Sequence, residues 1–259
     1  MLPAVIDKSI LSFTRRATPR LRSVYLPSLG QRLELPGLAS SVYQQIFIMG
    51  EYRPVRALPP GARIIDLGAF LGLFSIYAAR ICQGARITAV EANPKTIPAL
   101  TANIKAQGGR NGAQIDIRAE AVSDHRGTLQ FTMSRNDDAH VAGTAYRHTD
   151  DFTDHDQLVT VEVPCVPFSD YLQEPVDFLK CDVEGAEYAA LGSIDLTPAL
   201  IREAVIEFHD LDRNSKALFD LLEKARSAGY RIHAVDGRPF TGDSQIPTAD
   251  STTLHLVGL

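Results

Sequence analysis

From residue 63 to residue 257 the sequence alternates short apolar segments with longer stretches of helical spacing. This alternation is typical of βαβ units, in which parallel strands form a sheet and helices cover its faces. Strands are expected at residues 63–67, 86–90, 114–118, 176–181, 203–208, 230–235 and 252–257, and helices at 70–81, 94–106, 184–191 and 215–228. The pattern predicts one doubly wound α/β sheet, which binds ligands at the carboxyl ends of its strands.

Three segments depart from this alternation. Residues 1–50 predict an N-terminal helical cap, with a Pro/Gly-rich bend between residues 27 and 37, before a main domain at 51–259. Residues 119–133, with a turn at Gly127, predict a hairpin. Residues 134–157 form a polar insertion rich in aspartate and histidine. A mobile lid or solvated loop explains the insertion better than a metal cluster, because its histidines match no standard ligand spacing.

Charge and cysteine usage exclude several classes of protein. The chain has 26 Lys and Arg against 31 Asp and Glu, a net charge of −5, so nucleic acid is not an expected partner. No window reaches the roughly 18 apolar residues of a membrane span. Three cysteines without CxxC spacing indicate neither a disulfide framework nor a zinc knuckle, and a cytoplasmic location is expected.

The sharpest local signal is the glycine turn Asp66-x-Gly68-Ala69-x-x-Gly72, at the end of the first expected strand of the sheet. Glycines allow a tight turn and close approach of a ligand to the backbone. A dinucleotide site would have a second glycine where Ala69-Phe70 stands. The turn therefore disfavours a dinucleotide and favours a ligand with one nucleoside and no phosphate.

Acidic residues end the next two strands. Glu91, 25 residues after Asp66, can accept hydrogen bonds from both hydroxyls of a ribose; the alternative is an acid that caps the following helix. Glu120 could accept from an adenine amino group, and Ala121 could pack on the ring.

With these motifs the sequence resembles the FkbM-type branch of class I S-adenosylmethionine-dependent methyltransferases, over about residues 45–235. The resemblance also rests on five further blocks: Gly50-Glu51-Tyr52, Val90-Glu91-Ala92-Asn93-Pro94, Ala121-Val122-Ser123-Asp124, the run from Phe178 to Glu187, and Ile206-Glu207-Phe208-His209. Phe70-Leu71 departs from the Asn-Ile or Asn-Val that is common in the family, and Ala92 departs from a common proline.

The resemblance implies a Rossmann-like methyltransferase sheet of seven strands, the last antiparallel, with S-adenosylmethionine as methyl donor. Glu51 or Tyr52 would close over the methionine end of the donor. The full set of expected cofactor-binding residues is Glu51, Tyr52, Asp66, Gly68, Ala69, Gly72, Glu91, Ala92, Asn93, Glu120, Ala121 and Asp182.

Two residues that follow neighbouring strands are candidates for catalysis. His209, with an ordinary pKa near 6.5, is the expected general base, and Asp182 would orient the acceptor or the donor's amino group. Asp182 could instead cap a helix, and His209 could make only a loop contact. No metal ligands are assigned, although Asp182, Glu207 and His209 could together hold a divalent cation.

The sequence therefore predicts an S-adenosylmethionine-dependent methyltransferase that methylates a hydroxyl of a small-molecule acceptor, such as a sugar or a secondary metabolite. The alternatives are a nicotinamide-dependent oxidoreductase and a non-catalytic cofactor-binding protein of the same fold. A homo-oligomer is left open.

Overall fold

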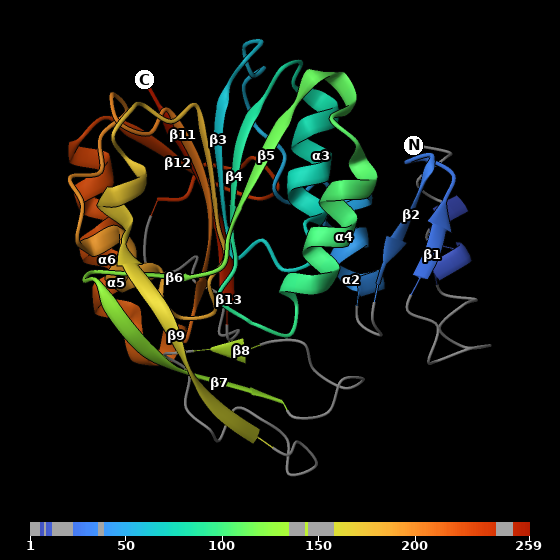
Figure 1. Ribbon diagram of the computed structural model, residues 1–259. Helices are drawn as coiled ribbons and strands as arrows, with labels where there is room; N and C mark the ends of the chain where they lie inside the picture. The colour runs from blue at the N-terminus through green and yellow to red at the C-terminus, as the bar shows by residue number, and fades with distance from the viewer. Residues whose placement is uncertain are drawn as a thin grey trace.

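The computed structural model describes residues 6–7, 9–11, 23–35, 39–134, 143–144, 158–241 and 251–259. Its centre is a seven-stranded sheet in the order β12-β13-β11-β10-β3-β4-β5 (Figure 1). The strands are β3 (Arg63–Leu67), β4 (Arg86–Val90), β5 (Gln114–Arg118), β10 (Phe178–Cys181), β11 (Glu203–His209), β12 (Tyr230–Ala234) and β13 (Ser251–Gly258). β13 runs antiparallel to both neighbours, and the other pairs are parallel. The predicted doubly wound sheet is confirmed.

Helices cover both faces of the sheet (Figure 1). α3 (Leu73–Ile81) and α4 (Ile97–Gln107) lie on one face, and α5 (Glu187–Gly192) and α6 (Leu211–Ser227) lie on the other. α3 begins later than residue 70, because Phe70 and Gly72 have φ angles of 51° and 78°, outside the right-handed helical region. α4 also begins later than predicted, and α6 begins earlier.

Successive residues of the central strands point to opposite faces of the sheet and pack into two separate apolar cores. In β3, Ile65 and Leu67 pack into the core under α5 and α6, whereas Ile64 packs into the core shared by α3 and the N-terminal segment. On the same face as Ile64, Asp66 lies directly beside Lys180 of β10 in the parallel register. A charged pair thus lies on the same sheet face that packs Ile64 against the core shared with α3.

A second, four-stranded sheet has the order β6-β9-β7-β8. Its strands are β6 (Ala121–Ser123), β7 (Gly127–Ser134), β8 (Gly143–Thr144) and β9 (Leu158–Pro167). The predicted hairpin of residues 119–133 is wrong, because β9 lies between β6 and β7 and pairs with both. Apart from Ser134 and β8, the predicted insertion at 134–157 lies outside the described residues.

The N-terminal segment contains a hairpin that the sequence did not predict, formed by β1 (Ser23–Leu26) and β2 (Gln31–Glu34). After the hairpin the segment contains α2 (Ala39–Tyr43), followed by the π-helical η1 (Gln44–Met49). The hairpin is held to α4, where the Asn103 amide donates to the carbonyl of Glu34 and its oxygen accepts from the Glu34 N–H. The division at residue 50 stays a prediction. Within the described segments no helix has both the length and the apolarity of a membrane span.

Candidate active site

A cavity of about 280 Å³ opens at the carboxyl ends of β3, β4 and β10. α2 and η1 of the N-terminal segment form part of its wall. The predicted site residues that line it are Tyr52, Gly68, Ala69, Glu91, Ala92, Asn93, Glu120, Ala121 and Asp182. Those that do not are Glu51, Asp66, Gly72 and His209. The structure therefore brings most of the predicted residues to one place and assigns the others to supporting positions.

The glycine turn crosses from β3 to α3 in close contact with its neighbours. The N–H groups of Gly68 and Ala69 both donate to the carbonyl of Val90 at 2.9 Å. Gly68 has a φ of +72°, and a Cβ there would lie 1.7 Å from the carbonyl oxygen of Asp182. Gly72 instead faces Leu100 of α4, so its role is in helix packing.

Glu91 lies at the cavity wall with both carboxylate oxygens held by backbone. Its Oε2 accepts from the N–H of Phe70 and its Oε1 from the N–H of Asn93, each at 2.7 Å. Burial raises the pKa of Glu91 and these two bonds oppose the rise. Each oxygen keeps a second lone pair for a ligand hydroxyl.

Glu120 and Ala121 line the cavity beyond the end of β5. Glu120 accepts a hydrogen bond from the hydroxyl of Tyr171, which fixes its position. Ala121 packs in a small apolar cluster with Phe131 of β7, and both residues face the cavity. This wall offers apolar surface beside one carboxylate, as an aromatic ring with a polar edge requires.

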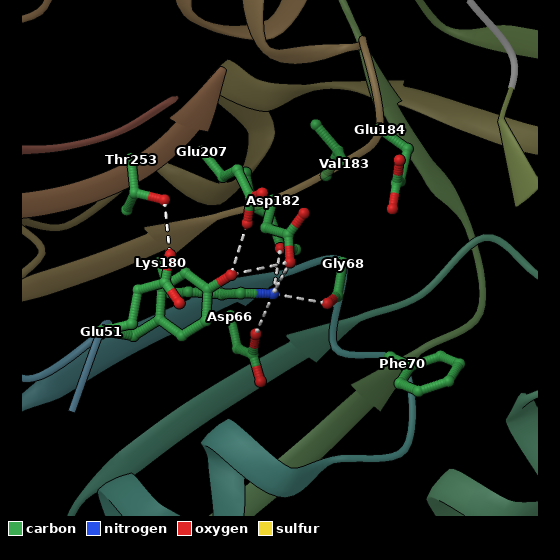
Figure 2. A network of polar contacts seen from close by, with 12 residues as sticks. Glu51, Asp66, Gly68, Phe70, Lys180, Asp182, Val183, Glu184, Glu207 and Thr253 are labelled. Carbon is green, nitrogen blue, oxygen red and sulfur yellow. Dashed lines mark hydrogen bonds and ion pairs between the residues drawn. The ribbon is translucent and has the colours of Figure 1, made fainter. Parts of the chain in front are cut away.

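Lys180 is the site residue that sequence reasoning missed (Figure 2). Its Nζ donates to the carbonyl of Gly68 at 2.6 Å and lies 3.5 Å from Asp66 Oδ1 and 3.3 Å from Asp182 Oδ2. Burial alone would lower the pKa of Lys180, but the charges of Asp182 and Asp66 outweigh it and raise the pKa, so the side chain is cationic. A lysine in a central strand whose other residues are apolar was the available signal.

Tyr52 joins the N-terminal segment to the carboxylates that end β10 and β11. Its hydroxyl lies 2.6 Å from Glu207 Oε2 and 3.3 Å from Asp182 Oδ2. Burial and the charges of Asp182 and Glu207 raise the pKa of Tyr52, so the hydroxyl is a neutral donor. Glu51 turns away from the cavity and accepts from Thr253 of β13 at 2.9 Å.

His209 lies behind the cavity and not in its lining. Its Nδ1 is 2.9 Å from Glu187, and its Nε2 faces the carboxylates of Asp182, Glu184 and Glu207. Burial lowers the pKa of His209, but Glu187 and the other carboxylates more than compensate and raise the pKa to about 10. This shift favours the imidazolium form, which is a poor proton acceptor, and the assignment of His209 as general base stays a prediction.

One family model and several curated proteins are similar to this chain. The sequence model described as Methyltransferase FkbM domain matches residues 66–232, more than half of the chain. The 31-O-demethyl-FK506 methyltransferase FkbM of Streptomyces tacrolimicus is 28% identical, over 80% of this chain and 87% of that protein. The AMB antimetabolite synthetase AmbE of Pseudomonas aeruginosa is 28% identical over 71% of this chain. The match covers only 10% of that synthetase. Among solved structures, M. jannaschii TYW2 in complex with AdoMet has a TM-score of 0.47 at 13% identity, over 92% of this chain and 86% of that one.

Proposed function

The chain belongs to the FkbM family of S-adenosylmethionine-dependent methyltransferases, and on that premise we propose that it methylates a hydroxyl oxygen of a small-molecule acceptor. The observation that carries the proposal is the pair of carboxylates, Asp182 and Glu207, that line the cavity and share the hydroxyl of Tyr52. A hydroxyl, unlike a neutral amine, has to lose its proton when it is methylated, and carboxylates can receive it. By its name, the Streptomyces relative acts on an oxygen of a small molecule.

The residues around the cavity fit the methyl donor. Glu91 offers two carboxylate oxygens to ribose hydroxyls, and the apolar wall of Ala121 and Phe131 beside Glu120 suits adenine. Asp182 offers a negative charge to the donor's amino group or sulfonium. Phe70 also lines the cavity, at the position where a dinucleotide site has a glycine. The turn therefore lacks the glycine-rich loop that binds the pyrophosphate of a nicotinamide dinucleotide, which argues against the oxidoreductase alternative.

Bound S-adenosylmethionine supplies a methyl group that is already activated on a sulfonium. The chain therefore has mainly to orient the acceptor oxygen and take its proton. Asp182 and Glu207 would do both, since burial and the charge of Asp182 raise the pKa of Glu207 toward the range of a useful base. Tyr52 keeps the two carboxylates in position, and protonated His209 balances their charge.

Replacing Glu91 with glutamine should weaken binding of S-adenosylhomocysteine about tenfold or more, since a hydrogen bond to a charged group contributes roughly 1.5–3 kcal/mol. The NH₂ group of the glutamine would also face the backbone N–H of either Phe70 or Asn93, so that two donors would meet where a hydrogen bond now exists. Calorimetric titration measures the affinity. Asp116→Asn is the matched control, because Asp116 is an exposed acid on the adjacent strand β5 and lies outside the cavity. An equal loss in both variants would rule out a specific role for Glu91.

Turnover tests the proposed function directly. The protein is incubated with S-adenosylmethionine and a panel of hydroxylated sugars and secondary metabolites, and S-adenosylhomocysteine release is measured. A product that gains one methoxy group by mass spectrometry and NMR is the expected result. A methyl group found on nitrogen or carbon would contradict it. Binding of S-adenosylhomocysteine without turnover of any acceptor would favour the non-catalytic alternative.

A further inference from the structure

The ends of β10 and β11 bring three polar atoms together beside the cavity. Asp182, Glu207 and His209 each offer one atom, and these atoms all lie within 4.8 Å of one another. His209 Nε2 is 3.9 Å from Asp182 Oδ1 and 3.7 Å from Glu207 Oε1. These separations are too long for hydrogen bonds, so the three atoms face a common point without bonding to each other.

The other side of the imidazole is fixed by a buried carboxylate. His209 Nδ1 lies 2.9 Å from Glu187 Oε1, and Glu187 is fully buried. Glu187 is held in turn by the N–H groups of Val183 and Gly185, at 3.1–3.2 Å. Histidines that bind metals commonly donate one ring N–H to a carboxylate in this way, which directs the other nitrogen at the ion. The side chain of His209 is 6% exposed, so its Nε2 is turned into the protein toward Asp182 and Glu207.

In both carboxylates, Asp182 and Glu207, the two oxygens contact different neighbours. Asp182 Oδ2 lies near Lys180 and Tyr52, and Glu207 Oε2 lies near Tyr52. The opposite oxygens, Oδ1 and Oε1, face His209, and Glu207 Oε1 also accepts a hydrogen bond from Ser251 at 3.1 Å. Glu184 adds a third carboxylate 3.6 Å from Nε2. Three carboxylates thus surround His209 Nε2, and a divalent cation bound there would displace the Nε2 proton to solvent and be held by their charge.

We propose that Asp182 Oδ1, Glu207 Oε1 and His209 Nε2 bind a divalent transition-metal cation such as Mn²⁺. Two carboxylates suit Mn²⁺, Mg²⁺ and Ca²⁺, and the imidazole favours the transition metal among them. Three protein ligands leave coordination positions open toward the cavity, which Asp182 and Glu207 line. If the proposed function holds, the acceptor hydroxyl takes one of these positions and the ion lowers its pKa.

Mn²⁺ binding can be tested without turnover. Protein treated with a chelator is titrated with MnCl₂ and followed by electron paramagnetic resonance, with circular dichroism as a check of folding. Wild-type protein should bind one ion and show coupling to an imidazole nitrogen. Asp182→Asn and Glu207→Gln should each weaken binding about tenfold or more, and His209→Gln should remove the nitrogen coupling.

His125→Asn is the matched control, because His125 forms an exposed pair with Asp124 away from the cavity. This variant should bind Mn²⁺ as the wild type does. The proposal is overturned if wild-type protein binds no Mn²⁺, or if folded Asp182→Asn and His209→Gln bind it unchanged. Because no acceptor is needed, a failure of hydroxyl methylation would leave this result intact, and the absence of a bound ion would leave the proposed function intact.

Discussion

Gly68→Ala should destabilise the protein by about 3–5 kcal/mol and abolish binding of S-adenosylhomocysteine. Two effects add. A non-glycine residue at a φ of +72° is strained, and its Cβ would lie 1.7 Å from the carbonyl oxygen of Asp182. The overlap is with backbone, so β3 and β10 would have to separate exactly where their ends form the cavity wall. Urea unfolding gives the loss of stability, and calorimetry gives the loss of affinity.

Gly61→Ala separates the two effects. Gly61 has a similar φ of +76°, but a Cβ there would meet nothing within 4 Å. This variant should lose only the strain energy, about 1–2 kcal/mol, and should keep its affinity for S-adenosylhomocysteine. If both variants lost the same amount, the close approach of Gly68 to Asp182 would not be the cause.

Lys180→Met should cost about 3–5 kcal/mol at neutral pH, because it removes the cation that neutralises a fully buried carboxylate. Asp66 is fully buried, its Oδ1 has no hydrogen bond, and its Oδ2 accepts from Ser75 at 2.7 Å. The double variant that adds Asp66→Asn should recover much of the loss. Chemical unfolding of the four proteins in this double-mutant cycle measures the coupling.

The cost of Lys180→Met should also depend on pH. Burial already raises the pKa of Asp66, and loss of the lysine charge would raise it further. Above the ordinary aspartate pKa of about 4, the unfolded chain gives up a proton that folded Asp66 retains, so stability falls as pH rises toward the folded pKa. The variant should therefore approach the wild type near pH 4 and fall furthest behind it near pH 7. A penalty independent of pH would point to lost packing instead.

The parts of the fold that depend on local pattern could be predicted, and those that depend on pairing over long distances could not. β3, β4 and β5 have the bounds that the sequence indicated, because each is a short segment with strand-like apolar positions between clear turn residues. The hairpin of residues 119–133 failed because β9, which begins at Leu158, competes for both of its strands. The residues near Gly127 do not indicate that the distant strand β9 pairs with both β6 and β7.

In the candidate site, too, the residues that depend on local sequence could be predicted and those that depend on distant contacts could not. Glu91 and Gly68 could be assigned to the cavity because a strand end fixes where they lie. Lys180 was missed because its partners are more than a hundred positions away in the chain, at Asp66 and Gly68. The raised pKa of His209 could not be predicted either, since it depends on Glu187 and three further carboxylates that come together only in the folded chain.

The bond from Lys180 to the carbonyl of Gly68 spans 112 positions of the chain. During synthesis, β3, the glycine turn and β4 therefore leave the ribosome long before the side chain that holds the turn in place has been made. Until β10 has emerged and paired with β3, Asp66 has no cation beside it, and the turn is held by its hydrogen bonds to Val90 without the bond from Lys180. The part of the cavity wall that Lys180 and Asp182 form is therefore completed only once the second half of the sheet has been made.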